Sequence, residues 1–208
     1  MSAAVCAQLR GRCRTIAVNN VGIDTVDSTT GELMRAPAPW ADVLFASDAK
    51  WWRQYQARAM AFAGLKITSM NGLTWDGLHN VAFSPRAPFD DRPTHMVSGG
   101  NSGYQAVHIA AHFGATRILL VGFDMREVTG RRHYFGNHPA PCNSKGRFHI
   151  WIRNFQSLAA YLGAQGVQVV NCTPGSALKG LKVSTLDKEF PPASLVDIRK
   201  LDPITEVA

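Results

Sequence analysis

Residues 101–125, NSGYQAVHIAAHFGATRILLVGFDM, contain the clearest helix and the clearest strand of the sequence. Helical spacing predicts one core-facing set of side chains: Ala106, Val107, Ala110 and Phe113. Gly114 then ends the helix. The run RILLVGFDM (117–125) is almost continuously apolar, as in a strand of a parallel sheet that is buried on both faces. A helix that leads into such a strand predicts an α/β fold.

The rest of the chain repeats this alternation of strands and helices. Further strands are predicted at 14–20, 41–48, 65–70 and 167–173, and further helices at 49–64 and 148–166. We predict one α/β domain over residues 1–190, with a mostly parallel sheet and helices on both faces, followed by a Pro-punctuated tail at 191–208.

The composition is that of a globular protein, with 46% hydrophobic and 18% charged residues. No apolar run is long enough to span a bilayer, and the N-terminus lacks the apolar core of a secretory signal, so we expect a cytoplasmic protein. The four cysteines have no C-x-x-C spacing. We therefore expect free thiols at Cys6, Cys13, Cys142 and Cys172, without a metal or cofactor.

The net charge of +7 suits an anionic ligand such as a nucleotide, a phosphorylated sugar or nucleic acid. The basic residues are dispersed, with TGRRH (129–133) as the densest cluster, and no Lys/Arg run is interleaved with aromatic residues. The sequence thus carries no specific nucleic-acid signal. A solvated basic surface is the alternative explanation, and formation of a homo-oligomer stays open.

Polar residues follow the apolar runs of the predicted strands. In open α/β sheets the ligand crevice lies beyond the carboxyl ends of the strands, so these residues are candidates for a binding site. They are Asn19, Asn20, Ser47, Asp48, Asp124, Asn171 and Thr173. Asp124 is also a catalytic candidate, since it can orient a hydroxyl, bind a metal or cap the following turn. The alternative is that they cap helices and form turns.

The glycine-rich turn SGGNSG (98–103) precedes the helix of the opening stretch. The backbone N–H groups of a helix N-terminus can bind an anion, and Asn101 or Ser102 can cap the helix or contact the ligand. The alternative is a tight packing turn, since no Walker or G-x-G-x-x-G motif is present. His108 and His112 have the i, i+4 spacing of a metal pair, but a half-exposed helix face is the preferred interpretation.

Two Gly- and Pro-rich excursions, at 71–97 and 126–146, have the length of lids or binding elements. The first contains one expected edge strand. In the second, RRHYFGNHP (131–139) brings together histidines, a tyrosine and arginines. A histidine is a natural general base, and Arg with Tyr neutralises a leaving phosphate. A solvated loop is the alternative.

Three segments together resemble known enzymes: residues 101–125, HYFGNH (133–138) and VQVVNCTPGSALK (167–179). Their order resembles that of motifs in bacterial CMP-sialic-acid-dependent sialyltransferases of glycosyltransferase family 42. It is also similar to a wider Rossmann-like group that includes archaeal-type 6-hydroxymethylpterin pyrophosphokinases and uncharacterised phage or prophage proteins, the last being the most similar. The resemblance covers roughly residues 14–180 and implies a Rossmann-like three-layer sandwich.

The resemblance to sialyltransferases implies a nucleotide or nucleotide-sugar ligand. It implies that Asn19 and Asn20 contact the nucleotide and that Ser102 and Gly103 hold the cytidine phosphate part of the donor. It also places three residues at the rim of the crevice: Asn171, Thr173 and Ser176.

For catalysis, the resemblance implies His138 as general base, with His133 as the second choice. Tyr134 is the only nearby match to the lid tyrosines that assist the departing phosphate, and Arg131 and Arg132 are the candidates to stabilise it.

The chain departs from the family pattern in two ways. The family begins with a strand and a G-x-G-P-S-L turn, and nothing like it precedes residues 14–20. Unless the native chain starts upstream, we expect an unfilled slot or an exposed edge in the sheet. The segment between Asp124 and His138 is also shorter than in the sialyltransferases and lacks their paired tyrosines, which leaves catalysis open.

Three functions follow as hypotheses. The first is sugar transfer from a CMP-sugar-like donor. The second is diphosphate transfer from Mg-ATP to an alcohol, with Asp48 and Asp124 as metal candidates. The third is a phage-derived binding or assembly module without catalysis.

Overall fold

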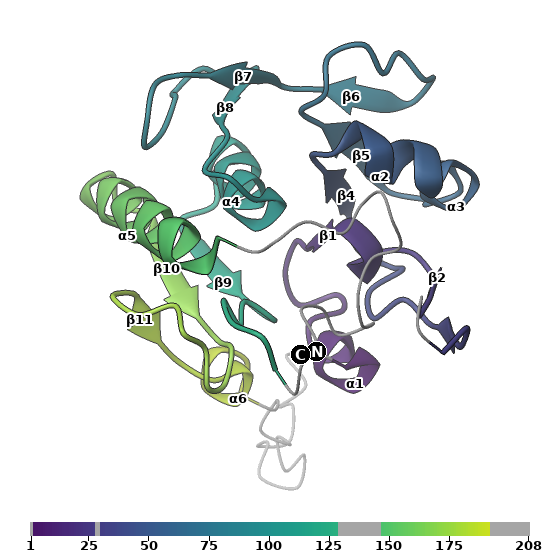
Figure 1. Cartoon of the computed structure of the whole chain (residues 1–208). Coiled ribbons are helices and arrows are strands. Elements are labelled where there is room, and N and C mark those ends of the chain that lie inside the picture. The colour runs from purple at the N-terminus through teal and green to yellow at the C-terminus, as the bar shows by residue number, and fades with distance from the viewer. Residues whose placement is uncertain (1, 28–29, 129–146, 192–208) are drawn as a thin grey trace, which may run out of the picture.

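The computed structural model describes residues 2–27, 30–128 and 147–191, which form a mixed α/β structure (Figure 1). The larger sheet has four parallel strands in the order β1-β4-β5-β6. Their bounds are β1 Ile16–Val18, β4 Val43–Ala46, β5 Leu65–Thr68 and β6 Leu78–Asn80. Ala17 lies opposite Leu44 in the β1–β4 ladder, and Leu44 lies opposite Lys66 in the β4–β5 ladder.

A second sheet contains three parallel strands in the order β11-β10-β9. These are β9 (Arg117–Leu120), β10 (Gln168–Asn171) and β11 (Lys182–Val183). Two smaller pairs complete the described strands: antiparallel β2 (Thr25–Val26) with β3 (Leu33–Met34), and parallel β7 (Ala82–Ser84) with β8 (His95–Val97).

Helices cover both faces of the four-stranded sheet. On one face, Ala17, Leu44 and Ala46 pack against the tryptophans of α2 (Ala49–Gln54) and against α3 (Gln56–Met60). On the other face, Val43, Phe45 and Ile67 pack against α4 (Ser102–His112). The strands are apolar on both faces because both faces are buried.

The second sheet is covered in the same way. Ile118, Leu120 and Val169 pack against α4 and α5 (Phe148–Ala164). On the opposite face, Val170 and Cys172 pack against Leu9, which follows α1 (Ala3–Ala7), and against α6 (Leu186–Glu189). Helix α4 therefore contacts both sheets, as Figure 1 shows.

The order of the strands reverses between β1 and β9. From β1 the chain adds β4, β5 and β6 in one direction, and from β9 it adds β10 and β11 in the other. The short 3-10 helix η1 (Asn19–Val21) follows β1 at this place. In parallel α/β sheets, ligands bind beyond the carboxyl ends of the strands at such a reversal.

The predicted α/β class and mostly parallel pairing are confirmed. The helix predicted at 49–64 is divided, because Tyr55 leaves the helical conformation (φ −112°, ψ 18°) between α2 and α3. Asp48 is the N-cap residue of α2 but its side chain accepts no capping hydrogen bond. Phe113 was wrongly predicted to face the core, since it is 59% exposed at the end of α4.

The excursion at 71–97 contains more strand than expected. It holds the edge strand β6 and also the β7–β8 pair. Asp90, between β7 and β8, accepts hydrogen bonds from Ser84 and Arg92 and is itself buried. These bonds hold the pKa of its carboxyl well below the ordinary value. The segment is thus fixed by a polar network that periodicity does not reveal.

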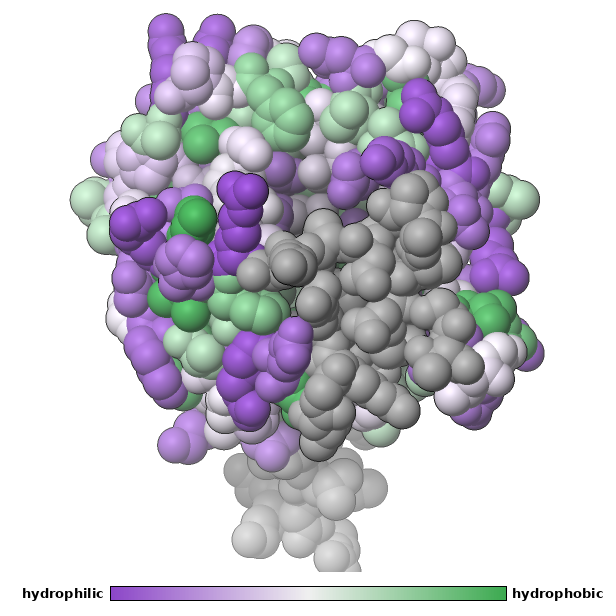
Figure 2. Space-filling model, viewed as in Figure 1, coloured by the Kyte–Doolittle hydropathy of each residue, from purple (hydrophilic) through white to green (hydrophobic). Residues whose placement is uncertain are grey.

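None of the described helices is long and apolar enough to cross a membrane. On the coloured surface in Figure 2, hydrophilic side chains are interspersed with smaller hydrophobic groups. Cys6, Cys13 and Cys172 are free thiols, and Cys142 lies outside the described residues.

Candidate functional site

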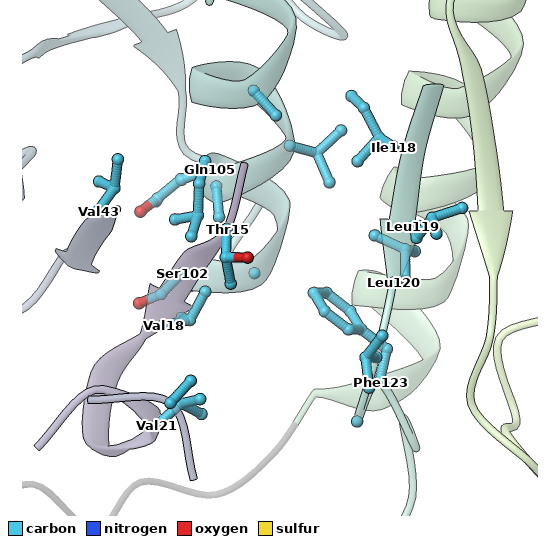
Figure 3. A pocket seen from close by; sticks show the side chains of 18 of the residues that line it. Thr15, Val18, Val21, Val43, Ser102, Gln105, Ile118, Leu119, Leu120 and Phe123 are labelled. Atoms are coloured by element: carbon cyan, nitrogen blue, oxygen red, sulfur yellow. The ribbon is translucent and has the colours of Figure 1, made fainter. Parts of the chain in front are cut away.

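A cavity of about 1340 Å³ lies between β1 and β9, with α4 along one side (Figure 3). Its middle is apolar and includes Ile16, Val18, Leu119 and Leu120. Its polar end lies where β1, β4 and β9 finish. The predicted site residues that line the cavity are Asn19, Ser47, Asp48, Asn101, Ser102, Gly103 and Asp124.

The N-terminus of α4 contributes three of these residues. Asn101 is the N-cap, and its Oδ1 accepts a hydrogen bond of 2.9 Å from the Tyr104 amide. Its Nδ2 is buried and has no partner among the described residues. The predicted cap is therefore confirmed, and one donor at the cavity wall stays unsatisfied.

The glycines of this turn have packing roles. A Cβ on Gly99 would lie 2.1 Å from the Tyr104 ring, and one on Gly103 would lie 2.6 Å from the Phe123 ring. Gly99 and Gly100 also have φ angles of +55° and +85°, which L side chains rarely adopt. The packing interpretation of the turn is thus sufficient to explain its glycines, whether or not a ligand binds.

The ends of β1 and β4 form the opposite wall of the polar end. Asn19 has a φ of 54°, a left-handed conformation that asparagine tolerates better than most residues. Ser47 is half-buried and Asp48 is exposed. These residues lie close together because β1 and β4 are adjacent parallel strands, which finish at the same edge of the sheet.

The turn after β9 closes the polar end. Gly122 and Met125 both have positive φ angles (79° and 51°), so the backbone bends sharply around Asp124. The carbonyl of Asp124 accepts a hydrogen bond of 2.8 Å from the Ala177 amide, whereas no described residue hydrogen-bonds its carboxylate. The carboxylate at the cavity is therefore available to a ligand.

Asn20 does not line the cavity. It is fully buried, and its Oδ1 accepts a hydrogen bond of 2.8 Å from the indole Nε1 of Trp51. Of the two asparagines at the end of β1, only Asn19 is at the cavity.

Asn171, Thr173 and Ser176 also lie away from the cavity lining and are buried. Asn171 donates to the Leu178 carbonyl (3.2 Å) and accepts from the Thr173 amide (3.0 Å). The Thr173 hydroxyl accepts from the Phe123 amide, and the Ser176 hydroxyl donates to the Phe123 carbonyl. These side chains hold the turn after β9 in place.

His108 and His112 do not form a metal pair. His108 is fully buried, its Nε2 lies 3.1 Å from the Pro88 carbonyl oxygen, and its ring stacks on Phe89 at 4.4 Å between centroids. Burial lowers the pKa of His108 to about 4, so the ring is neutral at physiological pH. No cluster of three metal-binding side chains occurs in the described part of the chain.

Apart from Asp124, the residues predicted for catalysis and for the leaving phosphate lie outside the described residues. They are Arg131, Arg132, His133, Tyr134 and His138.

Two residues at the cavity were not identified from the sequence. Gln105 is 2% exposed, its Nε2 donates to the Ser98 carbonyl, and its Oε1 has no partner in the described residues. Arg126 is exposed at the polar end and donates to the Gly175 carbonyl through Nε. The sequence offered one signal for each residue. Gln105 stands beside the apolar face of the predicted helix, and Arg126 follows directly after GFDM (122–125).

Comparisons with family models, curated proteins and solved structures found no match to this chain.

Proposed function

We propose that the protein binds a nucleotide or nucleotide sugar at the polar end of the cavity, in a Rossmann-like three-layer fold. The observation that carries the proposal is the convergence of polar side chains from the ends of β1, β4 and β9 and from the N-terminus of α4 on one cavity. This cavity lies where the strand order reverses, the place at which parallel α/β sheets bind ligands.

The groups at this end match the parts of a nucleotide. The N-terminus of α4 offers backbone N–H groups to a phosphate, and the Arg126 guanidinium supplies a positive charge at the same end. The unpaired Asn101 Nδ2 supplies a hydrogen-bond donor at the same end.

For the reaction, we propose glycosyl transfer from a CMP-sugar-like donor. His138, or His133 as the second choice, removes the proton from the acceptor hydroxyl. Tyr134, Arg131 and Arg132 stabilise the departing nucleotide phosphate. The resemblance to glycosyltransferase family 42 supports these roles, and His138→Ala is expected to abolish transfer while leaving nucleotide binding unchanged.

Binding is tested by titration calorimetry of the purified chain with CMP, CDP and a CMP-sugar. Arg126→Ala removes one charge-assisted contact and should weaken binding roughly 10-fold. Arg153→Ala is the matched control, since Arg153 is an exposed arginine of α5 outside the cavity lining. No heat of binding with any nucleotide, or equal losses in the two variants, would contradict the proposal.

A second candidate is diphosphate transfer from Mg-ATP, which the positions of Asp48 and Asp124 at the same cavity favour. Magnesium-dependent consumption of ATP, abolished by Asp124→Asn, distinguishes it from metal-independent sugar transfer.

A third candidate is a binding or assembly module without catalysis, which uses the cavity as its interaction site. The apolar middle of the cavity favours it. Binding of a macromolecular partner without turnover of any nucleotide would support this candidate against the two enzymes.

A further inference from the structure

Two sheet edges face each other across the apolar middle of the cavity. Among the described residues, β1 pairs only with β4, and β9 pairs only with β10. In Figure 3 the lining residues of β1 and β9 stand on opposite sides of the cavity, and Thr15 to Val21 run in the same direction as Ile118 to Phe123. The two strands therefore present parallel free edges to one space.

The hydrogen-bonding pattern shows which backbone groups face this space. The carbonyl of Thr15 accepts a hydrogen bond from the Val43 amide, so every second residue of β1 directs its backbone N–H and C=O groups toward β4. The backbone groups of the residues between them, Ile16 and Val18, face the cavity. The carbonyls of Thr116 and Leu120 accept from residues 168 and 172, so Leu119 points toward the cavity from β9.

The other two sides of the space are apolar. Ala106, Val107 and Ala110 of α4 line one side. Cys6 of α1 and Leu9 line the other. An apolar channel whose two edges carry unpaired N–H and C=O groups fits an extended peptide, because only a strand satisfies both backbone edges at once.

We propose that this channel binds one further β-strand, which runs parallel to β1 and β9, is apolar on both faces, and leads into α1. About three or four residues match the lengths of β1 and β9. The residues that face α4 are of small or moderate size, and the strand joins the two sheets into one. The inference is independent of the proposed ligand, which occupies the polar end.

The position of α1 identifies the source of the strand. Cys6 packs in the same core cluster as the tryptophans of α2, so α1 lies on the face of the first sheet that α2 and α3 cover. Those helices connect β4 to β5 on that face. If a strand in the channel is followed by α1 and then β1, its connection to β1 crosses the same face of the sheet as the connection from β4 to β5. Both connections also move along the sheet in the same direction, so they have the same handedness.

Segments of this chain outside the described residues fit the channel poorly. Residues 129–146 contain Pro, Gly and several basic residues, and residues 192–208 have Asp197 and Arg199 on either side of Ile198. A charged side chain in a strand buried on both faces is strongly unfavourable. The strand is therefore supplied by polypeptide joined ahead of α1.

The experiment extends the full chain at its amino terminus with a five-residue apolar strand and a short glycine-containing turn. The matched control carries the same length with alternating Asp and Pro. We expect the apolar extension to raise Tm by roughly 10 °C, since a fully buried strand contributes more than any single side chain. We also expect amide exchange of Ile16, Val18 and Leu119 to slow at least about 100-fold.

Two outcomes overturn the proposal: no difference between the two extensions, or amide exchange at Ile16, Val18 and Leu119 that is unchanged or faster. Because these readouts need no nucleotide, they succeed or fail separately from the titrations that test the proposed function.

Discussion

Gly103 in the first turn of α4 lies directly against the ring of Phe123, where a Cβ would stand 2.6 Å from the ring carbon Cε1. The contact joins the helix N-terminus at the cavity to the turn that follows β9. The polar end of the cavity is therefore held together by close packing as well as by hydrogen bonds.

Gly103→Ala should destabilise the protein by about 1–3 kcal/mol, because the added methyl group forces Phe123 or α4 to move. Urea denaturation monitored by circular dichroism measures the change. Phe123→Leu creates space at the contact, so the double variant should lose less than the sum of the two single variants. Strict additivity would show that the two residues are not in contact.

The fold should lose stability in mild acid through His108. Its pKa is about 4 in the folded protein against 6.5 for the ordinary value, because burial disfavours the charged ring; the Pro88 carbonyl and Asp90 oppose this effect, and His112 adds to it. The unfolded chain binds the proton first as pH falls. Stability is thus fully present above about pH 6.5 and is lost toward pH 4, by about 3 kcal/mol.

Chemical denaturation at several pH values between 4 and 7 measures this dependence. His108→Leu removes the titrating ring and should flatten the curve over this range, at some cost in stability at pH 7. If the unfolding free energy of His108→Leu falls with pH as steeply as that of the parent chain, groups other than His108 cause the loss of stability.

The hydrogen bond between Asn20 and Trp51 should contribute to stability and not to ligand binding. Asn20→Ala leaves the buried indole N–H without its acceptor, at a cost of about 1–3 kcal/mol. Trp51→Phe removes the donor, and a double-mutant cycle on thermal unfolding isolates the coupling between the two side chains. A coupling energy near zero would contradict the contact.

Thr173→Val tests whether the residues after β10 are structural. The valine removes a hydroxyl that accepts from the Phe123 amide and donates to the Leu120 carbonyl. We expect a loss of about 1–3 kcal/mol in unfolding free energy, with nucleotide affinity changed less than about 3-fold. Unchanged stability with a large loss of affinity would instead place Thr173 in contact with the ligand.

The elements of this fold that the sequence predicts well are those with a strong apolar pattern. Helix α4 and strand β9 follow from the spacing of Ala106 and Val107 and from the apolar run at 117–121. The β7–β8 pair was missed, because strands of three residues held by Asp90 and its partners have no periodicity to detect.

The site was predicted only in part for a related reason. A polar residue at a strand end can turn either toward the crevice or into the core, and the sequence does not distinguish the two. Asn19 and Asn20 are adjacent, yet η1 directs one to the cavity and the other to Trp51. Gln105 was overlooked because glutamine is also common on exposed helix faces.

The most direct test of the central claim is a titration of the isotopically labelled chain with CMP, followed by NMR of the backbone amides. We predict that the amides of Asn19, Ser47, Ser102 and Gly103 shift together and saturate with one dissociation constant. Residues around Gln54, an exposed residue of α2 that does not line the cavity, should not move. Spectra that stay unchanged at saturating CMP, or shifts confined to residues outside the cavity, would contradict a nucleotide site at the carboxyl ends of β1, β4 and β9.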